Sequence, residues 1–316
     1  MTSKTGVAAS TEAHSDALMI VDNFLSHESA EAMRADIDSH FSAPFGHRPE
    51  THQVWNYWFV PQAYAYFRTQ PEKVIRQDKV TSFMGQLRTW SIQTLGLGWL
   101  SWPYLSLYIS GCRQGLHNDA KNGRFAFVYS LTRDQRRSTG GETLVLRHGD
   151  PFLRNLGKAS AGTALHELVE PRFNRLVVFD DRMVHGVQLV EGAMNPIDGR
   201  FVMHGHIQES GPIVSGPLPR EPLLQGLRVA LDQFDQECAD QVRNYAGPLV
   251  LQFTISPEGR VGPLRVLLDR VFAAREGHAS WSRTRNRLME LLDGVSFPAA
   301  ESATRVTLPL RLGALT

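Results

Sequence analysis

Residues 104–119 decide the fold of this chain and read YLSLYISGCRQGLHND. The stretch joins an apolar, strand-like run to a glycine-containing turn and then to the triplet His117-Asn118-Asp119. Side chains at positions i and i+2 of a strand point to the same face, so His117 and Asp119 can bind one cation together. A third protein ligand must then come from another part of the chain.

His185, in the strand-like run 184–190, is the candidate for that third ligand. Two imidazoles and one carboxylate on one face are the donor set of non-haem Fe(II) oxygenases, and they leave three coordination positions open. A histidine and a carboxylate two positions apart are weak evidence alone, because the chain contains 12 His and 32 acidic residues. The pattern of the surrounding residues strengthens the assignment.

Short β-rich runs follow one another from residue 99 to residue 207, separated by Gly, Asp and Asn. They cover 104–110, 125–131, 143–146, 165–168, 175–179, 184–190 and 200–207. This spacing is typical of an antiparallel barrel or jelly roll. Upstream, the pattern predicts a strand over 18–21, a helix over 28–40 with Ser26 as its N-cap, and helical structure over 72–98. The aromatic-rich residues 42–70 form either a core-facing layer or one wall of a substrate pocket.

The stretch from about Leu18 to His206 resembles the prolyl-4-hydroxylase-like branch of the Fe(II)/2-oxoglutarate-dependent oxygenases. The matching features occur in family order: Tyr108 with Gly111 and Gly115, the His117/Asp119 pair, Tyr129-Ser130-Leu131-Thr132, Gly140-Gly141, His185 and Arg200. The resemblance implies a mainly β fold with flanking helices around a double-stranded β-helix (jelly-roll or cupin-like) core. It also implies Fe(II), with 2-oxoglutarate and O2 as co-substrates and succinate and CO2 as products.

The resemblance also assigns roles to individual residues. His117, Asp119 and His185 become the metal ligands and the catalytic centre. The distal carboxylate of 2-oxoglutarate needs a buried cation; the chain has no Lys beyond Lys158, and Arg200 has the right position for a bidentate guanidinium contact. Val202 stands where some relatives carry a serine that also binds this carboxylate. Tyr129 matches a family tyrosine that replaces the serine hydroxyl, and Tyr108 matches an aromatic residue near the keto acid.

Several neighbouring residues carry two interpretations each. His204 and His206 share the strand face of Arg200 and form either a second metal site or satisfied pocket histidines. Arg182 is interpreted either as a residue of a predicted turn or as a contact to substrate. Cys112 is expected to be a small buried residue. Halogenating relatives have Gly or Ala in place of Asp119, so the carboxylate favours hydroxylation. Desaturation and ring formation stay open.

The C-terminal third has a different pattern. Prolines and glycines concentrate in 210–219, which we interpret as a linker. Beyond it we expect an αββαβ domain over 220–316, with helices at 223–245 and 281–292 and strands at 249–255, 261–267 and 306–312. Residues 245–261, YAGPLVLQFTISPEGRV, resemble TonB C-terminal-like domains of the AgmX/PglI type. Such domains bind peptide or protein by strand addition, here expected at the edges 249–255 or 306–312; a homodimer contact is the alternative.

Composition limits the remaining choices. The chain has 316 residues, a net charge of +1 and two cysteines, which indicates neither nucleic-acid binding nor a disulfide framework. No apolar run is long enough for a membrane span, and residues 1–17 are expected to form a flexible tail, so a cytoplasmic enzyme with an oxygenase domain over 18–209 is predicted. The expected activity is C–H hydroxylation of a peptide or protein side chain. The alternatives are a free amino acid or small natural product as substrate, and a non-enzymatic peptide-binding module.

Overall fold

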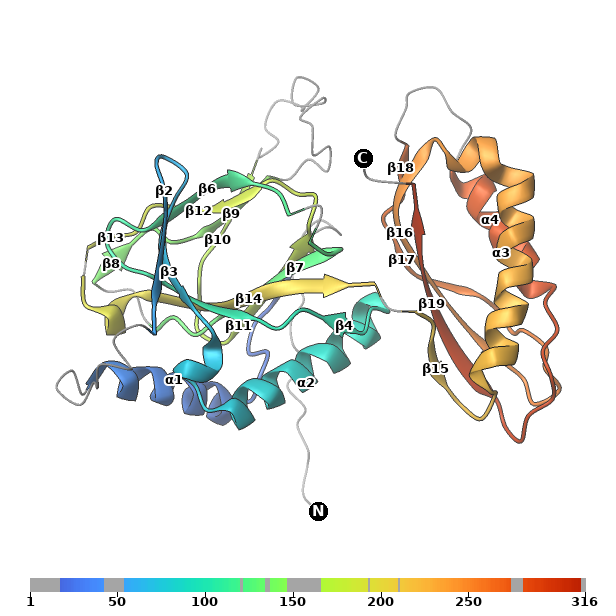
Figure 1. The fold of residues 1–316 in the computed structure, drawn as a ribbon, viewed down its shortest axis with the longest axis horizontal. Helices are drawn as coiled ribbons and strands as arrows, with labels where there is room; N and C mark the ends of the chain where they lie inside the picture. The colour runs from blue at the N-terminus through green and yellow to red at the C-terminus, as the bar shows by residue number, and fades with distance from the viewer. Residues whose placement is uncertain are drawn as a thin grey trace, which may run out of the picture. The chain divides into compact units, whose positions relative to one another are not determined.

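The computed structural model describes residues 18–42, 54–119, 122–133, 137–146, 166–192, 194–209, 211–273 and 281–313. They divide into two compact units, shown in Figure 1. The first unit runs to Leu87 and resumes over Leu100–Gln208, and the second combines Arg88–Trp99 with the residues from Glu209 onward. No described helix combines the length and the apolarity that crossing a membrane requires.

Eight antiparallel strands form the core of the first unit, in two runs of four. One run is β11-β7-β14-β5 and the other is β6-β12-β9-β10. Their bounds are β5 Tyr104–Tyr108, β6 Arg113–His117, β7 Phe125–Ser130, β9 Thr143–Leu146, β10 His166–Val169, β11 Arg175–Asp180, β12 His185–Val187 and β14 Arg200–Gln208. Two four-stranded runs whose strands alternate along the chain are the architecture of a jelly roll. The predicted mainly β fold with a double-stranded β-helix core is therefore confirmed.

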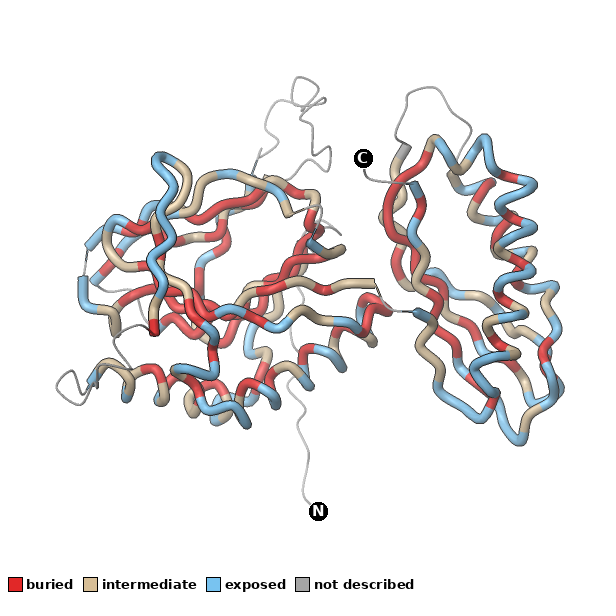
Figure 2. The backbone as a smooth tube through the Cα atoms, viewed as in Figure 1, coloured by how far each residue is buried: buried red, intermediate tan, exposed pale blue. Residues whose placement is uncertain are grey.

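One further strand, β3 (Tyr64–Thr69), links the two runs because it pairs with both β5 and β6. Short strands and short 3-10 helices complete the first unit, and one of these strands, β4, lies at the boundary with the second unit along the chain. They are β1 Leu18–Val21, β2 Asn56–Val60, β4 Trp99–Leu100, β8 Ser138–Thr139, β13 Glu191–Gly192, η3 Pro71–Lys73 and η5 Pro196–Asp198. Figure 2 shows that buried residues follow the core strands.

Helix α1 (His27–Ser42) and the part of α2 (Gln77–Leu95) up to Leu87 lie along the strand run that contains β7 and β11 (Figure 1). Ser26 caps α1 as predicted, since its Oγ accepts a hydrogen bond of 3.2 Å from the Ser29 amide. The Phe83 ring of α2 packs 4.8 Å from the Tyr129 ring of β7. This contact places Tyr129 on the helix-facing side of the sheet. Val128, the preceding residue of the same strand, lines the interior of the barrel.

The aromatic residues of 42–70 were expected to form either a core-facing layer or one wall of a substrate pocket, and strands β2 and β3 differ in this respect. In β2 the side chains face solvent, with Tyr57 56% and Phe59 60% exposed, so a core-facing layer is wrong for this strand. In β3, Tyr66 is buried and lines the central cavity, which agrees with the pocket-wall interpretation. Residues 43–53 of the segment lie outside the described residues.

The second unit is a small α+β structure in which two helices pack on one sheet. Its larger elements follow the predicted αββαβ order, and two short strands are added to it. The sheet order is β15-β19-β16-β17, with β18 also paired to β16. The bounds are β15 Ile213–Ser215, α3 Arg220–Val242, β16 Tyr245–Ile255, β17 Arg265–Asp269, β18 Phe272–Ala273, α4 Trp281–Asp293 and β19 Thr304–Leu312. The core joins both helices to the sheet through residues such as Leu227, Phe234, Leu251, Phe253, Leu288 and Leu292.

Three details of the second unit differ from the prediction. Residues 213–215 of the expected linker form strand β15. Residues 88–99 also belong to this unit. They pack closely on β16, since a Cβ on Gly96, which has a φ of +69°, would lie 2.3 Å from Cγ1 of Val250. Finally, β16 is not an edge, because it pairs with β19 on one side and β17 on the other. The predicted docking edge at 249–255 is therefore wrong.

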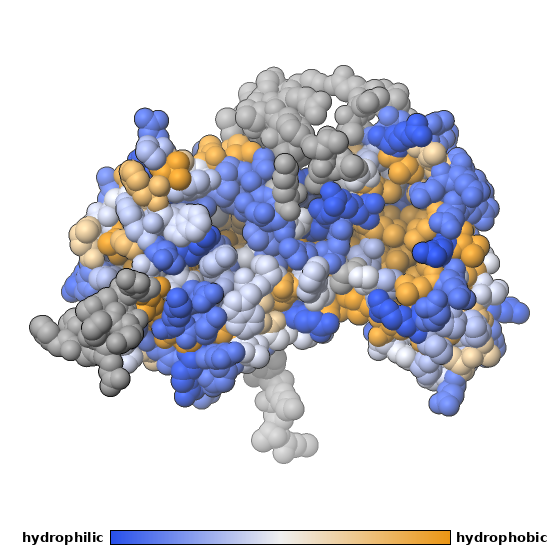
Figure 3. Space-filling model, in the orientation of Figure 1, coloured by the Kyte–Doolittle hydropathy of each residue, from blue (hydrophilic) through white to orange (hydrophobic). Residues whose placement is uncertain are grey.

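An apolar groove of about 570 Å³ lies between α3 and β19. Leu224 and Leu231 line it from the helix, and Leu308 and Leu310 line it from the strand. The buried face of α3 contains Leu223 and Leu227, so Leu224 and Leu231 stand at its border rather than in the core. Figure 3 shows apolar surface on the second unit between the sheet and the helix.

Candidate active site

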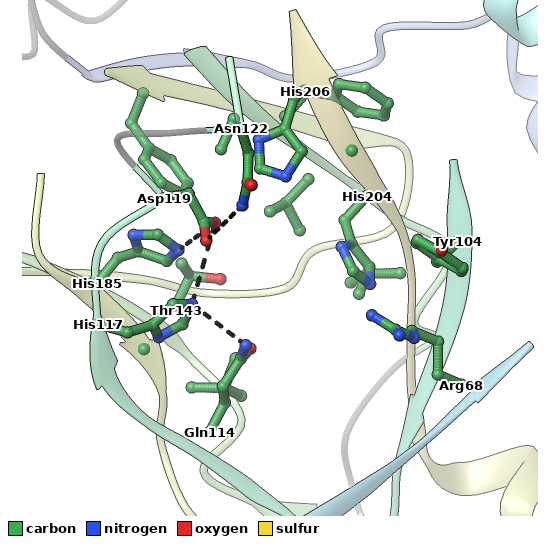
Figure 4. A pocket seen from close by; sticks show the side chains of 18 of the residues that line it. Arg68, Tyr104, Gln114, His117, Asp119, Asn122, Thr143, His185, His204 and His206 are labelled. Carbon is green, nitrogen blue, oxygen red and sulfur yellow. Dashed lines mark hydrogen bonds and ion pairs between the residues drawn. The ribbon is translucent and has the colours of Figure 1, made fainter. Parts of the chain in front are cut away.

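A cavity of about 470 Å³ opens into the barrel of the first unit, between the two strand runs. Side chains of β3, β5, β6, β12 and β14 line it. Its volume is in the range of pockets that bind small ligands. Figure 4 shows the polar side chains that point into it.

His117, Asp119 and His185 come together at one side of this cavity. His117 and His185 are paired neighbours on β6 and β12, and their ring centroids are 4.3 Å apart. Oδ2 of Asp119 lies 3.4 Å from Nε2 of His185 and 4.0 Å from Nε2 of His117. One ligand atom from each residue falls within 4.8 Å of the others, and this is the one such group of three among the residues described. The spacing suits a single divalent ion.

The position of Asp119 differs from the prediction in one respect. Strand β6 ends at His117, so Asp119 follows the strand instead of continuing its alternation. The Asp119 amide donates a hydrogen bond of 2.8 Å to the carbonyl of Asp181, which holds the turn against the end of β11. A tertiary contact, rather than strand geometry, therefore turns the carboxylate toward the two imidazoles.

Backbone carbonyls orient both histidine rings. Nδ1 of His117 lies 2.8 Å from the carbonyl of Gly115, and Nδ1 of His185 lies 2.9 Å from the carbonyl of Met183. A carbonyl can only accept, so each Nδ1 donates and each Nε2 is left to face Asp119. Such contacts fix the tautomer and the ring orientation of metal-binding histidines. Burial, and then the neighbouring His185, lower the pKa of His117, which favours the neutral imidazole that binds metal.

Two side-chain amides that the sequence analysis did not identify contact the polar atoms of Asp119 and His117. Asn122 donates from Nδ2 to Oδ1 of Asp119 at 3.2 Å, so Oδ2 is left for the histidines. Nε2 of Gln114 lies 3.3 Å from Nε2 of His117, and Oε1 of Gln114 accepts a hydrogen bond from the hydroxyl of Tyr108. No sequence pattern distinguishes these two amides from the many other polar residues near the turn.

The charge of Asp119 is well defined. Burial by itself would raise the pKa of this carboxyl group, but the neighbouring His185 and His117 lower it to about 2. Asp119 is therefore anionic near neutral pH. An anionic carboxylate is the form in which the group can bind a cation.

Arg200 lies at the start of β14 and is 2% exposed. Its Nη2 donates to Oγ1 of Thr143 at 3.0 Å, and its Cζ lies 4.8 Å from the centre of the Tyr108 ring. Nε and Nη1 are buried and have no hydrogen-bond partner among the described residues. Burial lowers the pKa of Arg200, but a guanidinium remains protonated in proteins. Buried donors without partners are costly, so this side chain is suited to an anionic ligand.

The two predicted tyrosines lie in different places. Tyr108 lines the cavity and stacks on Tyr66 with ring centroids 5.2 Å apart, and burial raises its pKa. Tyr129 does not face the cavity. Its hydroxyl donates to Oδ1 of Asn174 at 2.9 Å, its ring packs on Phe83, and burial raises its pKa as well. Strand alternation on β7 therefore makes Tyr129 a core residue and not a partner of the co-substrate.

His204 and His206 both line the cavity on the face of Arg200, as expected. Nε2 of His204 lies 2.8 Å from Oγ of Ser106, and Nδ1 of His206 lies 3.3 Å from the carboxylate of Asp181. These contacts agree with satisfied pocket histidines, and the described residues include no third ligand for a second metal there.

Two further residues from the sequence analysis lie close to this region. Nε of Arg182 donates to Oδ1 of Asp180 at 2.7 Å, and the side chain does not line the cavity. This ion pair supports the turn interpretation over a substrate contact. Cys112 is a buried free cysteine, as expected.

The chain was compared with curated proteins and with solved structures. No curated protein matches the chain. The chain is similar to a prolyl-4-hydroxylase from Pseudomonas putida (18% identity, 62% of this chain and 94% of that one, TM-score 0.44). It is also similar to a prolyl hydroxylase from Trichoplax adhaerens in complex with a hypoxia inducible factor peptide fragment (13%, 60% and 82%, TM-score 0.44). A third similar structure is the non-haem α-ketoglutarate-dependent epimerase SnoN from nogalamycin biosynthesis (13%, 60% and 77%, TM-score 0.41).

The family assignment comes from the sequence itself. Residues 104–208 match the model of the 2OG-Fe(II) oxygenase superfamily, and this segment runs from β5 through β14, the eight strands of the core. The match includes His117, Asp119, His185 and Arg200. It does not extend to residues 220–316, whose resemblance to TonB C-terminal-like domains stays a prediction. Residues 104–208 of this chain thus match the 2OG-Fe(II) oxygenase superfamily, and the protein is a 2-oxoglutarate-dependent iron dioxygenase that uses Fe(II), 2-oxoglutarate and O2.

Proposed function

We propose that this protein hydroxylates an unactivated C–H bond of a peptide or protein side chain at the cavity of the first unit. The observation that carries the proposal is the presence, in one cavity, of a three-residue cation site and a buried arginine with two unpartnered donors. A cation and a dicarboxylic acid are the two ligands that such a pair of sites accepts.

In this proposal His117, Asp119 and His185 hold Fe(II) through the two Nε2 atoms and the Asp119 carboxylate. When bound, the metal together with 2-oxoglutarate and O2 supplies the oxidising power that inserts one oxygen atom into the C–H bond, with release of succinate and CO2. The backbone bonds to Nδ1 of both histidines keep the donor atoms aimed at one point before any ligand arrives.

Arg200 binds the distal carboxylate of 2-oxoglutarate through Nε and Nη1, the two donors without partners. Thr143 holds the remaining nitrogen, Nη2, and the Tyr108 ring supports the guanidinium from the side. Because Arg200 is almost completely buried, water competes weakly for this carboxylate. The co-substrate site is therefore prearranged.

A peptide or protein substrate is favoured by the exposed strand β2. Its large side chains Tyr57, Trp58 and Phe59 face solvent, and β3 is the one described strand with which β2 pairs. The unpaired edge of such a strand can hydrogen-bond to an extended chain, and large exposed apolar patches mark interaction sites. Trp58 contacts Arg68, which lines the cavity, so a peptide on β2 has access to the reactive centre.

The test is turnover with two panels, one of peptides and one of free amino acids and small natural products, in the presence of Fe(II), 2-oxoglutarate and O2. Mass spectrometry of each product should show the addition of one oxygen atom, accompanied by one succinate. Oxidation in the peptide panel alone supports the proposal, and oxidation confined to small molecules replaces it with the second candidate. Loss of hydrogen without oxygen gain indicates desaturation or cyclisation. The complete donor set argues against a non-enzymatic module.

The second unit is proposed to be an accessory domain for substrate recruitment. It has its own core, and its apolar groove between α3 and β19 is the hollow on this unit that could take part. Of the two edges expected from the sequence, only 308–312 of β19 lacks a second strand partner in the described structure. A role in a homodimer is the alternative, and the mass in solution distinguishes it. A cytoplasmic location stays a prediction.

A further inference from the structure

Arg68 lies on the side of the cavity opposite the proposed metal ligands, as Figure 4 shows. It shares one face of β3 with Tyr64 and Tyr66. The Tyr64 ring lies 5.6 Å from that of His117, and the Tyr66 ring stacks on Tyr108. One strand face thus extends from the proposed metal site, past the proposed co-substrate site, to Arg68.

Two aromatic rings hold the Arg68 guanidinium in place. Its Cζ lies 3.7 Å from the centre of the Trp58 ring and 4.1 Å from that of the Tyr104 ring. The two rings come from β2 and β5, the strands on either side of β3. Contacts of this kind use the flat face of the guanidinium, and they leave its in-plane N–H groups able to donate to a ligand. Arg68 is therefore positioned without being neutralised.

Three other arginines of the first unit with little exposed surface each have a carboxylate partner. Arg34 pairs with Asp38, Arg175 with Asp22 and Arg182 with Asp180. Among the described residues, no carboxylate forms an ion pair with Arg68. Asp119, which the proposed metal requires, is the one acidic residue among the described residues that line the cavity. Two arginines, Arg68 and Arg200, thus face the cavity with their charge available for ligands.

The residues next to Arg68 leave this charge in place. His204 lies against Ser106, the residue that β5 pairs with Arg68. Burial, and then the charge of Arg68, lower the pKa of His204 to about 3, so this histidine is neutral and can only hydrogen-bond. His206 is occupied by Asp181. Tyr66 is a hydrogen-bond neighbour of Arg68 but carries no charge, so the positive charge of Arg68 is left for an anionic ligand.

We infer that Arg68 binds a carboxylate of the primary substrate, so that the oxygenase acts on an acid-bearing molecule whose carboxylate and reacting C–H bond lie at opposite sides of the cavity. This inference rests on the proposed function, because it takes Arg200 as the anchor of 2-oxoglutarate. A guanidinium held by its faces offers two parallel donors to a planar carboxylate. In a peptide substrate, the carboxylate is an acidic side chain or the chain terminus near the oxidised residue.

The test uses matched pairs of short peptides and N-acetylated amino acids, each in a free-acid and a carboxamide form. The measured quantity is the stimulation of succinate formation by each probe. With the wild-type chain, at least one acid should stimulate more than its amide, by about 10-fold or more in kcat/KM. In Arg68→Gln this preference should disappear, and Arg68→Lys should keep only part of it.

Arg113→Gln is the matched control, since Arg113 is an exposed residue of β6 that does not line the cavity, and it should keep the full preference. Binding of Fe(II) and 2-oxoglutarate is measured in every variant through the charge-transfer absorption of their complex. If no acid exceeds its amide, or if the preference survives in Arg68→Gln, the inference is wrong. If the wild-type chain does not bind Fe(II) and 2-oxoglutarate, the proposed function itself fails.

Discussion

His117 and His185 face each other as paired residues of β6 and β12, with 4.3 Å between their ring centroids. The pairing means that the two imidazoles approach each other as soon as these strands are in register. Asp119 then needs only the turn after β6 and its amide contact to Asp181 to complete the group. The cation site is therefore a product of strand register, and any slip of one residue would separate the two rings.

Replacing His117 or His185 by Ala should abolish succinate formation, because two protein ligands hold the metal too weakly. Fe(II) affinity, measured by equilibrium dialysis, should fall in both variants. His166→Ala is the control, since His166 is an exposed residue of β10 outside the cavity. Normal turnover in His117→Ala would show that the metal binds elsewhere.

Arg200→Ala should raise the KM for 2-oxoglutarate by about 30-fold or more, because truncating one partner of a buried charge pair costs ~2–5 kcal/mol. Fe(II) affinity should change little. Arg200→Lys should recover only part of the loss, since an ammonium cannot provide two parallel donors. Steady-state kinetics with varied 2-oxoglutarate give the answer, and an unchanged KM in the alanine variant would move the anchor to another residue.

Tyr129→Phe should lower the free energy of unfolding by about 1 kcal/mol and leave the KM for 2-oxoglutarate unchanged, because the lost hydrogen bond is the one to Asn174. Asn174 Oδ1 still accepts from the amide of Leu25, so the remaining acceptor is not left unpaired. Denaturant unfolding and steady-state kinetics provide the two measurements. A raised KM for 2-oxoglutarate would restore the role that the family resemblance gives this tyrosine.

The stability of the metal-free protein should depend on pH through His204. Burial lowers its folded-state pKa to about 3, below the unfolded value of about 6.5, so the unfolded chain binds the proton more readily. The contribution of His204 is therefore fully present above pH ~6.5 and is lost as the pH falls toward ~3, with a slope of up to ~1.4 kcal/mol per pH unit. Thermal unfolding between pH 4 and 7 should show a smaller slope in His204→Gln than in the wild-type chain. Equal slopes would contradict the burial of a neutral imidazole.

Ending the chain after Gln208 should give a poorly soluble product, because residues 88–99 lose the rest of their unit. Leu95 and Leu97 are almost completely buried, and exposing such side chains costs ~1.5–3 kcal/mol each. The shortened chain with Leu95→Gln and Leu97→Gln should regain solubility and bind 2-oxoglutarate. Soluble yield and the charge-transfer absorption test this. If the unaltered shortened chain is as soluble as the full chain, the two leucines are covered from within the first unit.

The core of the fold and part of the grouping of His117, Asp119 and His185 could be predicted because both follow from local patterns. Strand-like runs with turn residues between them locate β5 to β14, and histidine and aspartate at a fixed spacing locate His117 and Asp119. The direction of the Tyr129 side chain was not predicted correctly, because the resemblance to the oxygenase family gives only its position in the sequence. The direction follows from strand alternation, in which Val128 faces the cavity and Tyr129 packs on Phe83.

Contacts between distant parts of the chain account for the other differences. The central position of β16 depends on pairing with β17 and β19, and no short pattern encodes that order. Arg68 is distinguished by its neighbours on other strands, and Gln114 by its contacts with Tyr108 across a turn and with His117 on the same strand. Nothing in the local sequence around either residue distinguishes it from an ordinary surface side chain.

The second unit takes residues 88–99 from the middle of the chain, and this has a consequence for biosynthesis. Leu95 and Leu97 leave the ribosome before any strand of the barrel core and long before β16 and β19, the strands of their own unit. Their apolar surface must wait uncovered while the entire barrel is made, so the second unit closes last and through long-range contacts. For the same reason neither unit can be transferred whole to another protein by recombination at a single boundary, since one crossover would separate residues 88–99 from the rest of the second unit.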